Sequence, residues 1–398
     1  MSTFTVNFYS VKPYDETFFE RTRPSCEQQI GRRLRFVFNK ERLTVETAGA
    51  IVRGTVDAVC IFVNDDGSAP VLRTLAARGV GLLLLRCAGF NNVDLVCARS
   101  LGMPVMRVPR YSPNAVAEHA ATLLMSLTRH IPQASQRIRA HDFSLEGLEG
   151  HDLCHKTFGV VGTGAIGRIS ARILAGFGGR VYAYDPRPDP QWAARLGVQY
   201  VPLDELFRRC NVITLHVPLT PQNHHMINAR TLALMPAGVT IINTSRGGLI
   251  DTRAAVDALL SGKIAGLGID VYEGETPYFF GDHSREPMQD PLLAHLISMP
   301  NVIMTVCRFP SHLLVPFVLV FETFLTLLLS SLFPQGHQAF FTEDALTAIS
   351  EVTLGNLALY LRGRAAALQS PNECTHTAAA PLPKKQTFAH ESVLKAKL

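Results

Sequence analysis

The sequence predicts an α/β protein built on a doubly wound parallel sheet. Short apolar runs of strand length alternate with stretches of helical character from about residue 57 onward. The runs are apolar throughout, as expected of parallel strands that are buried on both faces. One run leads through a glycine-rich turn into a helix, an arrangement typical of the ligand-binding edge of such sheets.

The first predicted strands lie before residue 90. DAVCIFVN (57–64) and VGLLLLRCAG (80–89) are apolar runs, and the helical stretch PVLRTLAARG (70–79) separates them. A longer helix begins at Ser112, whose side chain can cap the helix, with Pro113 at the first helical position.

The second half of the chain repeats the pattern. Helix-like sequence separates the apolar runs, so we expect helices on both faces of the sheet. The predicted strands are KTFGVVG (156–162), GRVYAYD (179–185), CNVITLHVP (210–218), GVTIINTS (238–245) and AGLGIDVY (265–272).

Length and charge limit the function classes. A chain of 398 residues fits two or three domains. Lys and Arg total 38 against 33 Asp and Glu, and this net charge of +5 is spread without a basic run of five or more. Nucleic-acid binding needs a clustered basic patch, so we expect no nucleic-acid partner.

The cysteines and the two termini bear on location. The eight cysteines include no C-x-x-C pair and no Cys/His ligand spacing, which favours reduced thiols and predicts no metal site. The N-terminus has no secretory signal pattern, so we expect a cytoplasmic protein. The C-terminal Ala396-Lys397-Leu398 resembles a peroxisomal address, which leaves the peroxisome as an alternative. Residues 371–398 have turn-rich, aperiodic composition and predict a flexible tail.

The glycine-rich turn predicts a dinucleotide site. Gly162, Gly164 and Gly167 follow the strand 157–161 and open the helix 165–175. The first glycine permits the tight turn, the second lets the backbone approach a pyrophosphate, and the third allows close packing of helix and strand. The free N–H groups of the helix N-terminus favour that anion.

Asp185 specifies the nucleotide. It ends the next strand, 18 residues after Gly167, where its carboxylate can accept hydrogen bonds from a ribose 2′-hydroxyl. A carboxylate there repels a 2′-phosphate, so the sequence predicts NAD rather than NADP.

Hydride transfer to a carbonyl also needs a cation that polarises the carbonyl and an acid that donates a proton. Arg246 lies just past a predicted strand, and Gly247 and Gly248 behind it can free space for a ligand. A plain surface arginine is the alternative. Composition does not choose the acid among 14 histidines, although Glu275 could raise the pKa of a nearby one.

Seven sequence blocks, in order, resemble the D-isomer-specific 2-hydroxy-acid dehydrogenase family, and most closely its members that interconvert pyruvate and D-lactate. The resemblance covers residues 1–305 and 336–364. The blocks are RCAGFNNVD (86–94), VPRYSPNAVAEH (108–119), GVVGTGAIG (159–167), HVPLTPQN (216–223), NTSRGGLID (243–251), GIDVYEGE (268–275) and GHQAFFTEDAL (336–346).

The resemblance implies two Rossmann-like domains with a cleft between them. Residues 1–108 with 336–364 would form the substrate domain, and 109–304 the NAD domain. It also implies a homodimer with the helix after Ser112 in the interface, a small 2-keto or 2-hydroxy acid as substrate, and no metal.

The family's site roles transfer to matching positions. Arg246 would hold the substrate carboxylate and polarise its keto group, His337 would donate the proton, and Glu275 would orient that imidazole. The positions implied to line the NAD site are Ala165, Ile166, Asp185, Val217, Pro218, Asn223, Thr244, Ser245 and Asp270. The positions implied to contact substrate are Cys87, Ala88 and Gly89, through backbone N–H groups, and Tyr111.

The resemblance therefore implies reversible NAD-dependent reduction of pyruvate to D-lactate. One alternative is a reductase of glyoxylate, hydroxypyruvate or a bulkier 2-keto acid. Another is an NAD-sensing binding protein that resembles the C-terminal-binding corepressors; the presence of Arg246, Glu275 and His337 favours an enzyme.

Residues 306–335 interrupt the resemblance. Within them, 312–333 form an apolar stretch with a single acid, Glu322, and by length this stretch is a candidate membrane span. A span so close to His337, with Pro316 and Glu322 inside it, argues against that interpretation and against an inactive membrane-tethered product. A lid or interaction helix is a second interpretation, although it would expose a large apolar surface.

We favour a third interpretation, a retained intron translated in frame. The thirty residues are a whole number of codons, Val306-Cys307 can be encoded GTATGT, and Gln335 can end in CAG, which are common splice-site sequences. Removing them joins Thr305 to Gly336 and restores NVIMTGHQAFF. We expect the insertion to misplace His337.

Overall fold

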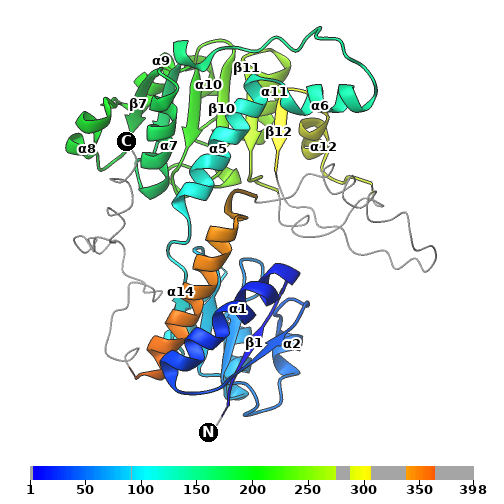
Figure 1. The fold of residues 1–398 in the computed structure, drawn as a ribbon, viewed down its shortest axis with the longest axis vertical. Helices are drawn as coiled ribbons and strands as arrows, with labels where there is room; N and C mark the ends of the chain where they lie inside the picture. Colours follow the sequence, from blue (N-terminus) through cyan, green and yellow to red (C-terminus); the bar gives the residue numbers. More distant parts are fainter. Residues whose placement is uncertain (1–2, 91, 275–286, 306–337, 364–398) are drawn as a thin grey trace, which may run out of the picture. The chain divides into compact units, whose positions relative to one another are not determined.

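The computed structural model describes residues 3–90, 92–274, 287–305 and 338–363 (Figure 1). The chain divides into two units, Met1–Pro109 with Ser350–Leu398, and Arg110–Ile349. Each unit contains one sheet, and every strand pairing in both sheets is parallel. The predicted α/β class with parallel sheets is therefore confirmed.

The first unit has five strands in the order β2-β1-β3-β4-β5. Their bounds are β1 Phe4–Phe8, β2 Leu34–Phe38, β3 Ala58–Ile61, β4 Leu82–Leu85 and β5 Val105–Arg107. Every residue of β3 and β4 is buried, which explains why both were predicted as apolar runs. Strand β1 pairs with two neighbours. Its Phe4 lies opposite Leu34 of β2, and its Val6 lies opposite Ala58 of β3.

The elements before residue 57 were not predicted. The helix α1 (Pro13–Ile30) buries only three side chains and contains Pro24, so its sequence shows no apolar helical face. Strand β2 has one fully buried residue and carries Arg35. Tertiary packing rather than a local apolar pattern therefore establishes these elements.

Helices cover both faces of the first sheet. One face packs on α2 (Val45–Gly49), α3 (Ala69–Ala77) and α4 (Leu95–Ser100). The other packs on α1 and on the part of α14 (Glu343–Leu361) that belongs to this unit from Ser350 onward.

The second unit has seven strands in the order β12-β11-β10-β9-β6-β7-β8. The order changes direction between β6 and β9, which makes this a doubly wound sheet. The strand bounds are β6 Thr157–Val161, β7 Arg180–Tyr184, β8 Gln199–Tyr200, β9 Val212–Leu215, β10 Val239–Asn243, β11 Ile264–Ile269 and β12 Val302–Met304. The five strands predicted in this half are β6, β7, β9, β10 and β11.

Two layers of helices enclose this sheet (Figure 1). One face packs on α5 (Pro113–Thr128), α7 (Ala165–Gly176) and α8 (Pro190–Leu196). The opposite face packs on α9 (Leu203–Arg209), α10 (Ala229–Leu234), α11 (Thr252–Leu260) and α12 (Pro291–Ser298). As predicted, Ser112 caps α5, where its Oγ accepts a hydrogen bond from the N–H of Ala115.

The remaining elements of the second unit are short. They are α6 (Ile131–Arg139), η1 (Leu153–His155), η2 (Gly247–Leu249) and η4 (Gln338–Phe340). Helix α6 buries none of its residues.

Several predictions fall outside the described residues. These are the insertion 306–335, with its apolar stretch 312–333, and the tail 371–398. Among the helices that the structure describes, none combines the length and apolarity needed to cross a bilayer. None of the six cysteines in the described ranges forms a disulfide.

Candidate active site

The carboxyl ends of β6 and β9 meet where the strand order of the second sheet changes direction. Gly162 follows β6 directly and has a φ of 92°, a left-handed conformation that favours glycine. A Cβ at Gly162 would lie 2.5 Å from the carbonyl oxygen of His216 and 2.7 Å from Cγ1 of Val217. The residues that follow β9 therefore leave no room for a side chain at position 162, where the tight turn was expected.

The other two glycines of the turn differ from each other. A Cβ at Gly167 would lie 1.8 Å from the carbonyl oxygen of Gly162. With any other residue at this position, helix α7 could not pack so closely against the turn. A Cβ at Gly164 would meet no protein atom within 4 Å. Packing within the protein therefore requires Gly167 but not Gly164, and the open space at Gly164 fits the close approach of a pyrophosphate.

The N-terminus of α7 supplies donors beside this space. Its first helical hydrogen bond runs from the N–H of Arg168 to the carbonyl of Gly164. The N–H groups of Ala165 and Ile166 therefore have no acceptor within the helix. Such groups, with the partial positive charge of the helix end, suit a phosphate.

Asp185 lies directly after β7 and is bound to the same turn. Its Oδ2 accepts hydrogen bonds from the N–H of Thr163 at 2.7 Å and from the Thr163 hydroxyl at 3.0 Å. Its Oδ1 accepts from the N–H of Arg187 at 2.8 Å. A carboxylate offers about four acceptor positions, so one remains for a ribose hydroxyl.

The segment after β9 contains three residues expected at the NAD site. Val217 is half-buried and Pro218 is exposed. The side chain of Asn223 closes its own loop, because its Oδ1 accepts from the N–H of Thr220 at 2.7 Å and its Nδ2 donates to the carbonyl of Pro218 at 2.8 Å. Asn223 therefore shapes the loop, and these two bonds use one of its two amide N–H groups.

His216 begins that segment and is half-buried. It shares a hydrogen bond of 2.9 Å between its Nε2 and the Thr214 hydroxyl, while its buried Nδ1 has no partner among the described residues. Burial disfavours the charged ring and lowers the pKa of His216 to about 4.

The segment after β10 carries Thr244, Ser245 and Arg246. Asn243 holds it in place, accepting a hydrogen bond from the N–H of Ser245 and donating one to the carbonyl of Arg246. The Ser245 hydroxyl donates to the carbonyl of Leu215 at 2.7 Å. The Thr244 hydroxyl is buried and has no hydrogen-bond partner within the described ranges, so it remains available to a ligand.

Arg246 is exposed, and its Nη1 donates to the carbonyl of Ser245 at 2.7 Å. In the part of the chain that the structure describes, no carboxylate pairs with its guanidinium. Because a guanidinium has five N–H donors, most of its capacity remains for a carboxylate ligand.

The glycine pair behind Arg246 has a different role from the predicted one. A Cβ at Gly247 would lie 2.1 Å from the backbone carbon of Tyr272 and 2.2 Å from the nitrogen of Glu273. A Cβ at Gly248 would lie 3.0 Å from Cδ2 of Leu219. The space that we attributed to a ligand is filled by neighbouring protein, and these glycines position the arginine loop.

Asp270 lies directly after β11 and is 2% exposed. Its Oδ1 accepts hydrogen bonds from the Thr305 hydroxyl at 2.5 Å and from the N–H of Gln338 at 2.8 Å, and its Oδ2 accepts from the N–H of Ala339 at 3.2 Å. One carboxylate therefore holds the residues on either side of positions 306–337.

His119 on α5 completes this cluster, and no role was predicted for it. Its Nε2 lies 3.0 Å from the Thr305 hydroxyl and 3.4 Å from Oδ1 of Asp270. His119 ends the block 108–119, but only the fold brings it to two residues that lie more than 150 positions further along the chain.

Tyr111 also lies in the second unit. Its ring makes an edge contact with Phe340 at 6.5 Å between centroids. Phe340 belongs to η4, so Tyr111 lies beside the short helix that follows position 337.

The predicted substrate loop Cys87–Gly89 lies in the first unit, just after β4. The carbonyl of Ala88 accepts a hydrogen bond from Nη1 of Arg107 at 2.8 Å, and the Cys87 thiol lies 3.2 Å from the carbonyl of Gly89. Arg86 precedes the loop and is 2% exposed.

Arg86 belongs to a buried polar network that sequence reasoning missed. Its Nε donates to Asp15 at 3.2 Å and its Nη2 donates to the carbonyl of Ser10 at 3.0 Å. The Ser10 hydroxyl donates to Asp65 at 2.7 Å, and Asp65 also accepts from the N–H of Phe62 at 2.7 Å. The network joins the carboxyl ends of β1, β3 and β4 and so positions the start of the predicted substrate loop.

Two predicted catalytic residues, Glu275 and His337, lie outside the described residues. The described residues nearest to them are Gly274 and Gln338, and Gln338 is bound to Asp270.

Comparisons with known proteins bear on this arrangement. Residues 121–306 match the NAD binding domain of D-isomer specific 2-hydroxyacid dehydrogenases. The chain is 46% identical over 352 residues to a 2-hydroxyacid dehydrogenase homolog of Haemophilus influenzae, which covers 88% of this chain and 95% of that protein. It is 45% identical over 366 residues to the D-lactate dehydrogenase of Escherichia coli, covering 92% and 98%.

A solved structure agrees with these matches. The pyruvate reductase of Chlamydomonas reinhardtii superposes with a TM-score of 0.77 at 39% identity, covering 91% of this chain and 97% of that chain. The matched range 121–306 contains the glycine-rich turn, Asp185 and Arg246, so the predicted dinucleotide motif lies in an NAD-binding domain.

Proposed function

Because this chain belongs to the D-isomer-specific 2-hydroxyacid dehydrogenase family, we propose that it reduces pyruvate to D-lactate with NADH, reversibly. The observation that carries the proposal is Arg246, an exposed guanidinium without a carboxylate partner in the described ranges, in the same unit as a turn that fits a dinucleotide. The names of two relatives, a D-lactate dehydrogenase and a pyruvate reductase, support pyruvate as the substrate.

Residues of the second unit would hold the cofactor. The N–H groups of Ala165 and Ile166 would bind its pyrophosphate over Gly164, and Asp185 would accept a ribose hydroxyl. The Thr244 hydroxyl, which has no partner among the described residues, would bind a further polar group. We expect Val217, Pro218, Asn223, Ser245 and Asp270 to line the site. When bound, NADH supplies the hydride that reduces the keto carbon.

Arg246 would bind the substrate by its carboxylate. A guanidinium can hold a carboxylate through two parallel hydrogen bonds, and a further N–H can polarise the adjacent keto oxygen. Reduction places negative charge on that oxygen, so the arginine would stabilise the transition state more than the substrate. We expect the backbone N–H groups of Cys87–Gly89 to add donors to the carboxylate, and Tyr111 to contact the substrate.

A proton must reach the developing alkoxide. We propose His337 as its donor, and as the base in the reverse reaction, with Glu275 keeping the imidazole protonated and oriented. The binding of Gln338 to Asp270 supports this role, because the residue that follows His337 is fixed in the same unit as Arg246.

Steady-state oxidation of NADH with a panel of 2-keto acids tests the proposal. We expect pyruvate to give the highest kcat/KM among pyruvate, glyoxylate and hydroxypyruvate, and NADH to be preferred over NADPH at least about tenfold because Asp185 repels a 2′-phosphate. A chain that binds NADH yet reduces none of the three acids would instead be a nucleotide-sensing protein.

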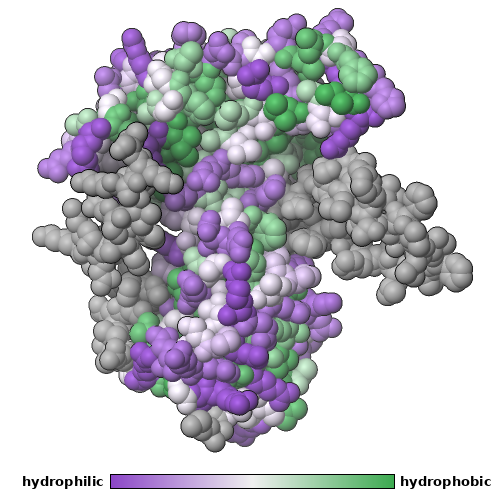
Figure 2. All heavy atoms as spheres, viewed as in Figure 1, coloured by the Kyte–Doolittle hydropathy of each residue, from purple (hydrophilic) through white to green (hydrophobic). Residues whose placement is uncertain are grey.

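We also propose a homodimer. Exposed apolar side chains gather on α6 and the segment after it, in the region of α6 and α12 in Figure 2. They are Ile131, Ile138, Phe143 and Leu145, each at least 55% exposed. Such a surface marks an interaction site. Light scattering should give twice the chain mass for the parent and the chain mass for Phe143→Asp/Leu145→Asp; a monomeric parent would contradict the dimer.

For location we propose the cytosol, since the described cysteines form no disulfides. Fluorescence of an N-terminally tagged chain should be diffuse. Punctate signal that disappears when Leu398 is deleted would instead establish peroxisomal import through the C-terminal tripeptide.

A further inference from the structure

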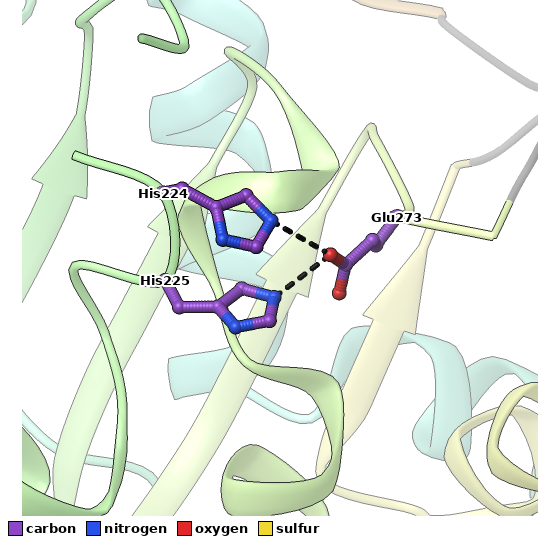
Figure 3. Close-up of side chains that lie close together, drawn as sticks. All are labelled: His224, His225 and Glu273. Carbon is purple, nitrogen blue, oxygen red and sulfur yellow. Dashed lines mark hydrogen bonds and ion pairs between the residues drawn. The ribbon is translucent and has the colours of Figure 1, made fainter. Parts of the chain in front are cut away.

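Two histidines and a glutamate converge at one point of the second unit (Figure 3). The Nε2 atoms of His224 and His225 lie 3.2 Å and 2.7 Å from the same oxygen, Oε1 of Glu273. The two imidazole rings stack at 3.8 Å between centroids. Both nitrogens therefore face one carboxylate oxygen from the same side.

The backbone holds this arrangement. His224 and His225 follow β9, and Glu273 follows β11. His225 has a φ of 51°, a left-handed conformation unusual for histidine, and its N–H donates to the carbonyl of Gly248 at 2.8 Å. Gly247 lets the backbone of Glu273 approach closely, so the same glycine pair that positions Arg246 brings the three ligands together.

We propose that His224, His225 and Glu273 form a binding site for a divalent transition-metal ion, with Zn²⁺ the best fit. Two imidazole nitrogens and one carboxylate oxygen are a ligand set that zinc takes readily. With zinc–ligand bonds of about 2.0–2.1 Å, neighbouring ligands of a tetrahedral ion lie about 3.3 Å apart. The observed 3.2 Å and 2.7 Å need only a small outward movement of the side chains.

The exchange is chemically simple. A cation would take the place of the hydrogen on each Nε2. A neutral ring moves that proton to Nδ1 and a charged ring releases it to water, so that each bound imidazole is neutral with its proton on Nδ1. Side chains that are 49%, 33% and 35% exposed leave room for water as the fourth ligand. Across the described ranges, this is the only trio of His, Cys, Asp or Glu side chains whose ligand atoms all lie within 4.8 Å of one another.

The site does not depend on the proposed reaction. No role in binding NAD or pyruvate is proposed for any of its three residues, and the inference goes beyond the dehydrogenase function. A bound ion would connect the segment after β9 to the segment after β11, which packs against Gly247 beside Arg246.

Competition for Zn²⁺ with a chromophoric chelator tests the proposal on the full chain. We expect one site with a Kd of about 10 µM or tighter, with three protein ligands and one water around the ion. His224→Gln and Glu273→Gln should each raise that Kd at least about tenfold. His224 is half-exposed, so its replacement should leave folding intact, which circular dichroism checks.

His295→Gln is the matched control, because His295 is an exposed histidine of the same unit outside the cluster. Its Kd should stay within about twofold of the parent value. Weak zinc binding by cysteines or other histidines is common to all variants and cancels in the comparison. If the His224→Gln chain binds Zn²⁺ as tightly as the His295→Gln chain, the proposed site does not exist.

Discussion

The two parallel sheets of this protein differ at the point where the strand order changes direction. In each sheet the strand order changes direction once, between β1 and β3 in the first and between β6 and β9 in the second. Such points open a crevice at the carboxyl ends of the strands, where α/β proteins bind ligands.

In the first sheet the protein fills this position with its own charges. Arg86, Asp15 and Asp65 are each no more than 6% exposed, and with Ser10 they form a continuous hydrogen-bonded network. Removing such charges from water is costly, so the network is stable only while every partner is present. The edge is therefore fixed and carries the Cys87–Gly89 loop.

In the second sheet, glycines determine the shape of the corresponding turn after β6. Gly162 and Gly167 let the turn and α7 close on each other, while Gly164 faces open space. An edge built from glycines therefore leaves its backbone donors available for a ligand, whereas the edge built from charges pairs most of its polar groups with one another. Among the described residues, the buried Nη1 of Arg86 is an exception without a hydrogen-bond partner.

The largest effect is expected from the glycine edge. Gly167→Ala places a Cβ 1.8 Å from the carbonyl oxygen of Gly162, so we expect the second unit to lose its native fold, seen as loss of its cooperative thermal transition. Gly164→Ala should fold normally but bind NADH at least about tenfold more weakly by fluorescence titration, because its Cβ occupies the open space. Equal NADH affinity in Gly164→Ala and the parent would contradict this division of roles.

Arg246→Gln should lower the catalytic rate without lowering the stability of the fold. We expect kcat/KM for pyruvate to fall by about 10³-fold, since a cation at the developing charge is lost, while the thermal midpoint stays unchanged because the side chain is exposed. Arg253→Gln, at an exposed arginine on α11, is the control and should keep full activity. Comparable losses in the two variants would mean that Arg246 acts only through the overall charge.

Arg86→Met should break the charged edge. It leaves Asp15 buried without its cation, which costs about 3–5 kcal/mol of unfolding free energy, measured by urea denaturation. Adding Asp15→Asn should restore part of that loss, because no unpaired charge remains. If the double variant is less stable than Arg86→Met, the pair does not behave as a coupled unit.

The smallest effect concerns pH. Burial lowers the pKa of His216 to about 4 from its ordinary value near 6.5, so between these values the unfolded chain binds a proton that the folded chain does not. Stability should therefore be complete above pH 6.5 and decline toward pH 4. His216→Gln should flatten this decline in urea midpoints measured at pH 7, 6, 5 and 4.5; parallel curves for the two chains would exclude His216 as the cause.

The same contrast explains what could be predicted from the sequence. The glycine turn and Arg246 lie in short contiguous motifs, so their positions at strand ends followed directly from local pattern. The network of the first sheet joins Ser10 to Asp65 across 55 positions and Arg86 to Asp15 across 71, and nothing local indicates such pairs. Helix α1 was missed because it buries only three side chains and its sequence shows no apolar helical face.

Other parts of the site also depend on distant neighbours. The role of Gly247 could not be assigned correctly because Tyr272 and Glu273 approach it only in the folded chain. The cluster of His224, His225 and Glu273 likewise needs the parallel arrangement of β9, β10 and β11 to bring its two segments together.

The described residues that flank positions 306–337 show how the chain could close if residues 306–335 were removed. The Thr305 hydroxyl and the Gln338 N–H bind the same oxygen of Asp270. In a chain that joins Thr305 to Gly336, only two residues would separate them, the spacing that a tight turn brings together. The shorter chain therefore needs no rearrangement of either flank.

Pyruvate reduction by that joined chain, with the lactate product resolved by chirality, tests the proposed dehydrogenase activity. We predict that NADH is oxidised in equal amount to D-lactate formed. We also predict that the chain with residues 306–335 turns over at least about 10²-fold more slowly, because we expect the insertion to misplace His337 and a shift of about 1 Å is enough for such a loss. Equal rates would show that the insertion leaves His337 in place. A joined chain that binds NADH but leaves pyruvate unreduced, or that forms L-lactate, would show that this protein does not reduce pyruvate to D-lactate.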